Sequence, residues 1–393
     1  MIEGTSEQHA LRNELDLQAM ISARARSIDA SGIRRVFELG SRLEDPVNLS
    51  IGQPDFPVPD AIKRATADAI AADRNGYTLT QGAPELLDSV RRRLQADVGW
   101  SFEEQGLIIT SGTSGALLLA FLALLDPGDE VIVGDPFFVI YPALAEISGA
   151  SCVLCDTYPD FRLTAARAEP LITSRTKALL VNSPGNPSGV VLSQSELSDL
   201  VDLCAARGIL LISDEIYDEF TYAESRENGA CPSPARLSDD VLLVRGFGKT
   251  YGCTGWRMGY AAGRPALIEQ MTKLQQYTFV CAPAMAQVGL AGAFDVDMRG
   301  HVATYQARRD RVVEALSSVT SVTFPGGAFY AFVEIPERLG LTGTAFAEEA
   351  IDRNLLVIPG KVFSQRDTHV RLSFAVADDR LGEGLAILRE MLA

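Results

Sequence analysis

The sequence predicts an α/β fold: a large domain with a mostly parallel central sheet covered by helices on both faces, followed by a smaller α+β unit. Three observations support this prediction. The chain has 393 residues, which is enough for two domains. From about Ala61 onward, short runs rich in leucine and β-branched residues alternate with helical stretches. After about Phe294 the alternation ends, and a long helical pattern precedes a mixture of short strands and one further helix.

The N-terminal part differs from the rest of the chain. Its first roughly 45 residues are charged and helical in pattern, and Leu11, Leu15 and Leu17 are spaced to share one helix face. Prolines then cluster, which predicts an extended segment. These prolines are Pro46, Pro54, Pro57 and Pro59.

Each apolar run of the large domain predicts one strand. The runs are Leu107–Thr110, Glu130–Val133, Ala178–Val181, Ile209–Ser213 and Val241–Val244. Helices are expected between them, including Ser114–Leu125 and Gln194–Ala206. Cys152 and Cys155 lie in a further run that we interpret as a buried strand, because no second cysteine pair or nearby histidine completes a zinc site.

The second unit begins with an expected helix over His301–Ser318. Strands are expected at Val322–Phe324, Phe329–Glu334 and His369–Phe374, with a helix near Thr344–Arg353. This order of elements is typical of an α+β unit rather than of a continued parallel sheet.

Charge and composition argue against several classes of protein. Lys and Arg total 35 and Asp and Glu total 51, a net charge of −16, which argues against nucleic-acid binding. His9, His301 and His369 form no close group, so we expect no metal site, and six cysteines are too sparse for a disulfide scaffold. Residues 1–10 lack the features of a signal peptide, and the longest apolar run, Ala116–Leu125, is too short to span a bilayer. We therefore expect a cytoplasmic protein that binds no membrane.

Ligands of open parallel sheets bind beyond the carboxyl ends of the strands, so the residues after each apolar run are informative. The first run is followed by Gly112, Thr113 and Ser114 at the start of an apolar helix, where amides and hydroxyls can bind an anion. The alternative for this turn is an ordinary helix cap. After Val181, two prolines and two glycines surround Asn186 in a rigid loop that suits ligand contact, or that is merely a turn.

The next two junctions carry ionisable side chains. Asp214 follows an apolar strand, where a buried carboxylate needs a cationic partner, and Tyr217 lies three residues later. The alternatives are a helix cap for Asp214 and core packing for Tyr217. Lys249 ends a glycine-rich strand junction, where desolvation can lower its pKa and make it a nucleophile, and Arg257 follows eight residues later. Taken singly, Lys249 and Arg257 would by default be interpreted as surface residues.

In combination, these junctions resemble the class I/II aminotransferases within the fold-type I pyridoxal 5′-phosphate enzymes. The resemblance covers nearly the whole chain, from Asn48–Phe56 to Val370–Phe374. Its most specific stretches are Asn-Pro-Ser-Gly at 186–189, Ser-Asp-Glu-Ile-Tyr at 213–217, and Lys249 with Gly-Trp-Arg-Met-Gly at 255–259. The resemblance implies an N-terminal segment (1–60) joining the small domain, a large cofactor-binding domain (61–295) and a small C-terminal domain (296–393). The small domain would thus be built from both chain ends.

The resemblance implies that Lys249, Asp214 and Tyr217 are the catalytic residues. Lys249 would hold pyridoxal 5′-phosphate as an internal Schiff base, and Asp214 would pair with the protonated pyridine nitrogen. The cationic ring would then supply the partner that a buried carboxylate needs. Asn186 and Tyr217 would hydrogen-bond the phenolic oxygen of the ring, and Phe138 would stack on the ring.

The phosphate of the cofactor would be bound by Arg257 and by the turn Gly112-Thr113-Ser114. Tyr77 matches a tyrosine that reaches the phosphate from the neighbouring subunit. The resemblance therefore implies a homodimer whose two sites are shared between the subunits.

The implied reaction is transamination between an L-amino acid and a 2-oxo acid such as 2-oxoglutarate or pyruvate. Arg371 would bind the α-carboxylate by a two-pronged contact, with Gly52 and Asn186 also at the substrate. Lys249, once displaced by the amino acid, would be the general base that moves the proton from Cα to C4′ of the cofactor.

The sequence also departs from its relatives. Gly246 and Gly248 stand where many relatives carry serines that touch the phosphate, which implies looser phosphate binding or a compensating donor such as Thr250 or Ser114. Ser114 stands where the aspartate and prephenate branch carries a lysine for the distal carboxylate. We therefore expect a neutral or aromatic amino donor rather than aspartate.

Two alternatives remain open at this point. The same cofactor residues would serve a lyase, a synthase or an oxidase of the same fold. A non-catalytic regulatory domain is a more remote alternative, because such domains usually carry a DNA-binding domain and the roughly 45 residues before Asn48 are few and not basic. The presence of Lys249, Asp214, Arg257 and Arg371 argues against a non-catalytic remnant.

Overall fold

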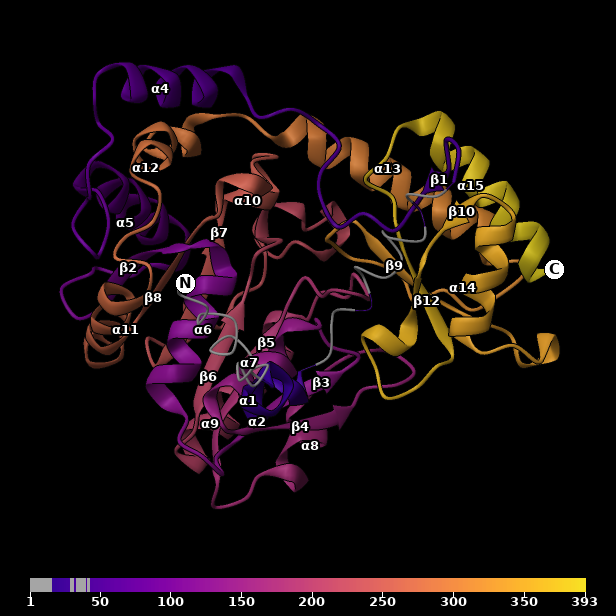
Figure 1. Cartoon of the computed structure of the whole chain (residues 1–393), viewed down its shortest axis with the longest axis horizontal. Helices are drawn as coiled ribbons and strands as arrows, with labels where there is room; N and C mark the ends of the chain where they lie inside the picture. Colours follow the sequence, from indigo (N-terminus) through magenta and orange to yellow (C-terminus); the bar gives the residue numbers. More distant parts are fainter. Residues whose placement is uncertain (1–15, 29–31, 33–39, 41–42) are drawn as a thin grey trace, which may run out of the picture.

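The computed structural model describes residues 16–28, 32, 40 and 43–393, and a seven-stranded sheet lies in its larger part (Figure 1). The order of the strands across the sheet is β2-β8-β7-β6-β5-β3-β4. Their bounds are β2 Gly106–Ser111, β3 Glu130–Asp135, β4 Ser151–Asp156, β5 Thr176–Asn182, β6 Leu210–Asp214, β7 Val241–Gly246 and β8 Met258–Gly263. Strands β3 to β7 pair in parallel, and β8 is antiparallel to both of its neighbours. The predicted α/β fold with a mostly parallel sheet is confirmed.

Helices cover both faces of this sheet, which explains why its strands are apolar without alternation. In β2, Ile108 packs with α6, α7 and α11, whereas Leu107 and Ile109 point to the other face, toward α5 and α12. The same second face is covered further along by α9 and the short α8, and α4 packs on α12. Their bounds are α4 Asp60–Ala71, α5 Pro84–Val98, α6 Gly112–Leu124, α7 Ile140–Ser148, α8 Ala165–Ala168, α9 Gln194–Arg207, α11 Pro265–Thr278 and α12 Ala284–Leu290.

The expected strands of the large unit are all present, with ends shifted by a few residues. One strand, β8, was not predicted. The run that contains Cys152 and Cys155 is strand β4, but it is only half-buried because it lies at the edge of the sheet. The two thiols pack into different core clusters on opposite faces of the sheet, and both are free.

The smaller unit contains a three-stranded antiparallel sheet of order β11-β12-β9. Its elements are β9 Tyr330–Glu334, β11 Ile358–Pro359, β12 His369–Ser373, α13 Arg299–Leu316, α14 Gly343–Asp352 and α15 Asp378–Leu392. The predicted strand over Val322–Phe324 is wrong: only Val322 forms a bridge, to Val333. Pro325 follows this run and has no backbone N–H to extend the pairing.

The described N-terminal residues contact both units. Strand β1 (Val47–Asn48) pairs in parallel with β10 (Leu355–Leu356) of the smaller unit. Helices α1 (Leu17–Met20) and α2 (Ala23–Ser27) precede it, and the Ser27 hydroxyl donates to Glu146 of α7 at 2.7 Å. Leu17 is largely exposed, and the expected positions of Leu11 and Leu15 lie outside the described residues.

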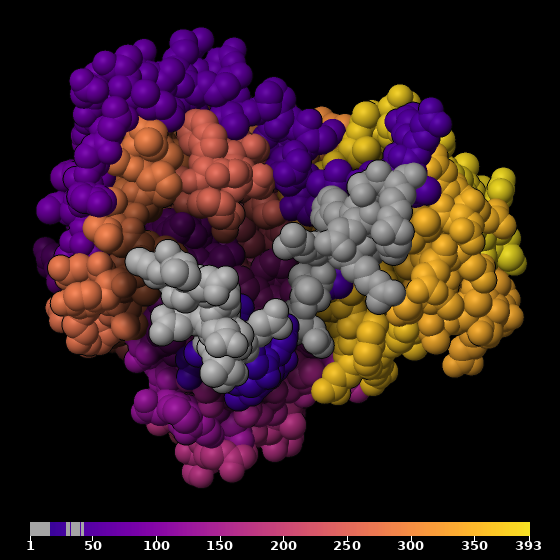
Figure 2. All heavy atoms as spheres, in the orientation of Figure 1, coloured from indigo at the N-terminus to yellow at the C-terminus, as the bar shows by residue number. Residues whose placement is uncertain are grey.

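We propose the division of the chain into residues 1–60, 61–295 and 296–393. The pairing of β1 with β10 supports a small domain that uses both chain ends, while the packing of α2 on α7 adds a contact to the large unit. Figure 2 shows that the face it presents is hollowed between the orange helices and the yellow elements. No helix in the described part of the chain combines the length and apolar character needed to cross a bilayer.

Candidate active site

A cavity of about 340 Å³ opens between the two units at the carboxyl ends of β5, β6 and β7. This volume is in the range of sites for small ligands and cofactors. Eleven residues that the sequence predicted for the site line it: Gly52, Gly112, Thr113, Ser114, Phe138, Asn186, Asp214, Tyr217, Lys249, Arg257 and Arg371. The chain topology brings them together from segments that are more than 300 residues apart in sequence.

Lys249 enters the cavity from the short helix α10 (Phe247–Thr250), which directly follows β7. Its Nζ donates a hydrogen bond to the carbonyl oxygen of Gly52. Burial, with the positive charges of Arg371 and Arg257, lowers the pKa of Lys249 from 10.5 to about 7. A large share of the amine is therefore neutral near pH 7, as a nucleophile or general base requires.

Asp214 is the last residue of β6, and only 2% of it is exposed. One carboxylate oxygen accepts from the Tyr141 hydroxyl at 2.8 Å, and the other accepts from the backbone N–H of Ile216 at 3.3 Å. Burial raises the pKa of Asp214 to about 6, although the Tyr141 hydrogen bond opposes this rise. The carboxylate lines the cavity, where a cationic group would stabilise its charged form.

Two buried tyrosines lie beside Lys249. The hydroxyls of Tyr217 and Tyr330 are 3.0 Å apart, and either one can be the donor. The Lys249 Nζ lies 5.9 Å from the centre of the Tyr217 ring. The wall of the cavity therefore presents hydroxyl groups next to the amine.

The start of α6 and Arg257 form an anion-binding wall. Gly112 has a φ of +71°, and a Cβ there would lie 2.8 Å from Nη2 of Arg257, so the guanidinium lies directly against the helix N-terminus. Thr113 and Ser114 line the cavity beside it. A helix N-terminus with a guanidinium is suited to a phosphate group.

Arg371 lies on β12 and is 1% exposed. Its Nη1 donates to Oδ1 of Asn186 at 3.1 Å and its Nη2 to the carbonyl of Ser50 at 2.9 Å. Both acceptors are neutral, and its buried Nε has no hydrogen-bond partner among the described residues. Burial lowers the pKa of Arg371 from its usual value. A buried guanidinium with an unused donor fits a carboxylate ligand.

A family model described as aminotransferase class I and II matches residues 44–388. The chain belongs to the class I and II aminotransferases. This aminotransferase is 32% identical over 382 residues to the probable aspartate aminotransferase of Methanocaldococcus jannaschii, covering 95% of this chain and 100% of that one. It is 30% identical to aromatic-amino-acid aminotransferase 2 of Thermococcus litoralis, covering 95% and 98% of the two chains.

A solved structure of the Thermus thermophilus aspartate aminotransferase with maleate matches with a TM-score of 0.87 at 32% identity. The match covers 95% of this chain and 99% of that one. The predicted family, the fold and the enzyme class, a transaminase, are thereby confirmed. The family is one of pyridoxal 5′-phosphate-dependent transaminases.

One predicted site residue of this aminotransferase lies outside the cavity. Tyr77 is 86% exposed and lines a separate surface groove between α12 and the loop that joins α4 to α5. The resemblance assigned Tyr77 to the site of a neighbouring subunit, and this assignment stays a prediction.

The two glycines that replace serines differ in their surroundings. A Cβ at Gly246 would lie 2.8 Å from Cδ1 of Ile216, whereas a Cβ at Gly248 would make ordinary contact with Thr254, 3.4 Å from its Cα. Thr250 lines a different groove, so the expectation that it compensates for the serines is wrong. Ser114 lines the cavity, as does Thr254.

Sequence reasoning missed Tyr141, Tyr330, Thr254 and the Ser50 carbonyl. Tyr141 lies on α7 and meets Asp214 only because α7 packs against β3, β4 and α6. Tyr330 follows Phe329 in an apolar run, where a phenolic hydroxyl is the one polar group that needs a partner. A hydroxyl in an apolar run indicates a buried hydrogen bond, but its partner, the Tyr217 hydroxyl, could not be identified from the sequence.

Proposed function

We propose that this aminotransferase binds pyridoxal 5′-phosphate through Lys249 and transfers an amino group from a neutral or aromatic L-amino acid to a 2-oxo acid such as 2-oxoglutarate or pyruvate. The observation that supports this most strongly is one cavity that holds three complementary groups. They are an amine of lowered pKa at Lys249, a buried carboxylate at Asp214 and an anion-binding wall at Arg257. These groups match the aldehyde, the ring nitrogen and the phosphate of the cofactor.

The residues of the cavity fit the cofactor in chemistry. When bound, the cofactor supplies an aldehyde carbon and a protonated ring that accepts electrons from the substrate Cα. Asp214 keeps the proton on the ring nitrogen, and Tyr141 orients that carboxylate. Tyr217 and Asn186 would hydrogen-bond the phenolic oxygen, and Phe138 would pack on the ring.

The remaining residues act on the phosphate and the substrate. Arg257 and the turn Gly112-Thr113-Ser114 bind the phosphate. Arg371 binds the α-carboxylate through donors that Asn186 and Ser50 hold in place, with Gly52 against the substrate. With the cofactor bound, Lys249 would be the general base that moves the proton from the substrate Cα to C4′ of the cofactor.

The charges of the cavity favour a donor without a second carboxylate. Among the described residues, the cations that line it are Lys249, Arg257 and Arg371, and each already has a role. Ile51 and Phe138 add apolar surface to the same wall. A distal carboxylate would lie there without a cation, which is costly in a partly dry site.

The proposal extends to the assembly and location of the enzyme. We propose a homodimer in which Tyr77 reaches the phosphate of the partner site. Tyr77 is exposed on a loop that two buried glutamines hold in place. Gln287 donates a hydrogen bond to the Thr78 hydroxyl, and Gln275 donates one to the Thr80 carbonyl. All six cysteines are free thiols, which supports a reducing, cytoplasmic location.

The central test is replacement of the proposed cofactor lysine. The purified enzyme is expected to absorb in the near-visible range. Lys249→Ala is expected to abolish both this band and turnover, because Lys249 is the only amine among the described residues that line the cavity. Lys177→Ala, which removes a half-exposed lysine outside the cavity, is the matched control and leaves both unchanged. A fully active Lys249→Ala enzyme would overturn the proposal.

Donor preference is tested with a panel of aspartate, phenylalanine, leucine and alanine, each against 2-oxoglutarate and pyruvate. We expect kcat/KM to be higher for at least one neutral donor than for aspartate. A strong preference for aspartate over all three neutral donors would contradict the proposed specificity while leaving the aminotransferase assignment intact.

A further inference from the structure

Tyr330 is the first residue of β9 and has no role among the residues predicted for the site. It is 1% exposed, and its side chain lines the cavity. Its hydroxyl lies 3.0 Å from the hydroxyl of Tyr217, and the two rings are perpendicular with centres 5.7 Å apart. The hydroxyl thus contacts the residue that is proposed to hydrogen-bond the phenolic oxygen of the cofactor.

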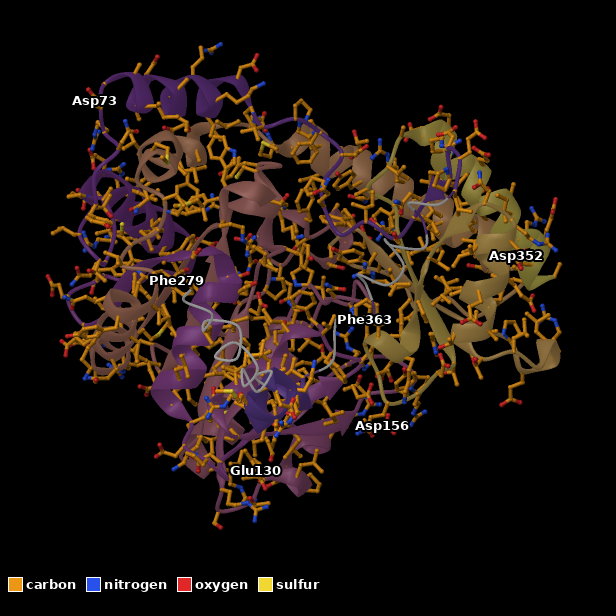
Figure 3. All side chains as sticks on the ribbon, viewed as in Figure 1. Asp73, Glu130, Asp156, Phe279, Asp352 and Phe363 are labelled. Atoms are coloured by element: carbon orange, nitrogen blue, oxygen red, sulfur yellow. The ribbon has the colours of Figure 1, made fainter. Side chains whose placement is uncertain are left out.

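The ring of Tyr330 contacts the proposed carboxylate-binding residue. In the antiparallel pairing of β9 with β12, Arg371 lies opposite Phe332, and Tyr330 lies two residues away on the same face. The guanidinium carbon of Arg371 is 4.5 Å from the centre of the Tyr330 ring and 4.6 Å from that of Phe363. Figure 3 shows Phe363 at the boundary between the two units. Two aromatic rings therefore restrain a guanidinium whose Nε finds no hydrogen-bond partner in the part of the chain that the structure describes.

The hydroxyl of Tyr330 also touches the backbone that carries the Lys249 acceptor. A Cβ at Gly52 would lie 3.0 Å from this hydroxyl oxygen and 3.9 Å from Nη2 of Arg371. The carbonyl of the same Gly52 accepts the hydrogen bond from Lys249. Tyr330 is therefore in contact with three groups of the site: the Tyr217 hydroxyl, the Arg371 guanidinium and the Gly52 backbone.

The direction of the hydrogen bond between the two tyrosines follows from the role proposed for Tyr217. Burial raises the pKa of Tyr217 well above its usual value and also raises that of Tyr330, so both are neutral hydroxyls with one proton each. If Tyr217 donates its proton to the phenolic oxygen, its own oxygen is free to accept from Tyr330. The charged groups that line the same cavity are Asp214, Lys249, Arg257 and Arg371.

We propose that Tyr330 is a positioning residue with two separable actions: its hydroxyl donates to Tyr217 and orients it toward the cofactor, and its ring holds Arg371 for the substrate carboxylate. This inference rests on the proposed function. It assigns one side chain to both the cofactor and the substrate subsite, so the two actions are separated by substitutions that remove the hydroxyl alone or the whole ring.

Tyr330→Phe removes the hydroxyl and keeps the ring. Without that hydroxyl, Tyr217 is oriented less firmly and donates a weaker hydrogen bond to the phenolic oxygen of the cofactor. This hydrogen bond disfavours the protonated form of the link between Lys249 and the cofactor, so weakening it favours the protonated form. The pH midpoint of the near-visible band of the holoenzyme is therefore expected to rise by about half a unit to one unit, the size of one hydrogen bond. KM for the amino donor is expected to change little, because the ring still restrains Arg371.

Tyr330→Leu removes both actions. It is expected to show the same rise in the midpoint and, in addition, a rise in KM of about 3- to 30-fold, the range of a partly to fully desolvated contact between a cation and an aromatic ring. Tyr158→Phe is the matched control, because it removes a hydroxyl that bonds Ser364 at 2.9 Å outside the cavity. It is expected to leave both the midpoint and KM unchanged.

The Tyr330→Phe measurement decides the proposal even where the leucine variant fails to fold, since phenylalanine preserves the packing. An unchanged midpoint in Tyr330→Phe, with the near-visible band present, overturns the role of the hydroxyl and leaves the proposed function intact. An unaltered KM in a folded Tyr330→Leu enzyme overturns the role of the ring. Absence of the band in the unsubstituted enzyme would instead count against the proposed function.

Discussion

At the scale of single residues, burial shifts the pKa values of Asp214 and Lys249 in the directions that favour their neutral forms. The pKa of Asp214 rises to about 6 and that of Lys249 falls to about 7, because both charges lose water. In the protein without cofactor, both groups therefore cost stability in their charged forms. The cationic ring of the bound cofactor would offset this cost at Asp214.

The pH dependence of Asp214 has a definite sign. Its pKa is higher in the folded protein than the 3.8 of an exposed carboxyl, so the folded state binds more protons between about pH 4 and 6. The stability contributed by this group is present below pH 4 and is lost as the pH rises through 6. Asp214→Asn is therefore expected to stabilise the cofactor-free protein at pH 7.5 by about 2 to 3 kcal/mol, and not at pH 4.

The measurement is urea unfolding of the cofactor-free wild-type and Asp214→Asn proteins at both pH values. The same substitution is expected to weaken cofactor binding. This second effect distinguishes a carboxylate that binds the cofactor from one that only destabilises the folded protein. Asp199→Asn, at an exposed position of α9, is the control and should change neither quantity. A stability difference that is the same at pH 4 and 7.5 would contradict this account.

The two glycines before Lys249 allow a second residue-scale prediction. Gly248→Ser is expected to fold normally, because its Cβ has room, and to tighten cofactor binding about 10-fold through a new hydroxyl at the cavity wall. Gly246→Ser is expected to lower the unfolding free energy by about 1 to 3 kcal/mol, because its Cβ would collide with Ile216 and Thr113.

Titration of the cofactor-free variants with cofactor, together with thermal unfolding, measures both effects. The two substitutions add the same atoms two residues apart, so each serves as the control for the other. Equal destabilisation by both serines would show that the difference in space around the two glycines has no energetic consequence.

At the scale of elements, one buried arginine joins the end of the strand that carries Asp214 to the strand that precedes Lys249. Arg245 on β7 donates to Glu215, just after β6, at 2.8 Å and 3.0 Å. It also donates to Asp97 on α5 at 2.6 Å and lies 3.4 Å from Asp218. The ends of β6 and β7 are thus held in register on the side of the sheet that faces away from the cavity.

Arg245→Met would leave the buried carboxylate of Glu215 and the partly buried carboxylates of Asp97 and Asp218 without this cation. The substitution is expected to lower the unfolding free energy by about 3 to 5 kcal/mol, the usual cost of breaking a buried ion pair. Arg207→Met is the control, because Arg207 and its partner Glu169 are both about half-exposed and such a pair is worth about 1 kcal/mol or less. Denaturant unfolding measures the unfolding free energy of both variants. Similar small losses of unfolding free energy would contradict a stabilising role for the Arg245 ion pairs.

The elements themselves were largely predictable from local pattern. The central strands are apolar runs because both faces of the sheet are buried, and α9 begins at a Ser193–Glu196 capping box that the sequence shows directly. Strand β8 was missed because its glycine- and alanine-rich run, Met258–Gly263, has little β propensity. It is held by antiparallel pairing to β2 and β7, which is a long-range effect.

At the scale of the whole molecule, the site combines both ends of the chain with the central sheet. The strand-end residues could be predicted because parallel strands end at the same edge of a sheet, which places Asn186, Asp214 and Lys249 together. Tyr141 and Tyr330 could not, because their contacts depend on how a helix and the smaller unit pack on that edge. Local sequence carries no information about that packing.

A shared site in a homodimer is the remaining prediction at this scale, and it can be tested by complementation. Tyr77 lies on the surface of its own chain, so its proposed action requires a partner. If the sites are shared, subunits with Tyr77→Ala and subunits with Lys249→Ala form mixed dimers in which one site has both native residues. Random mixing is expected to restore about a quarter of the wild-type activity, because half of the dimers are mixed and each has one intact site of two.

The matched control is a mixture of Lys249→Ala with Asp214→Asn. Both residues line the cavity of the same chain, so every site of that mixture lacks one of them and no activity is expected to return. Co-expressed and purified mixtures, assayed against each variant alone, give the comparison. If the Tyr77→Ala mixture also fails to exceed its separate components, Tyr77 does not act across a subunit boundary, and the exposed loop that Gln275 and Gln287 hold must have another role.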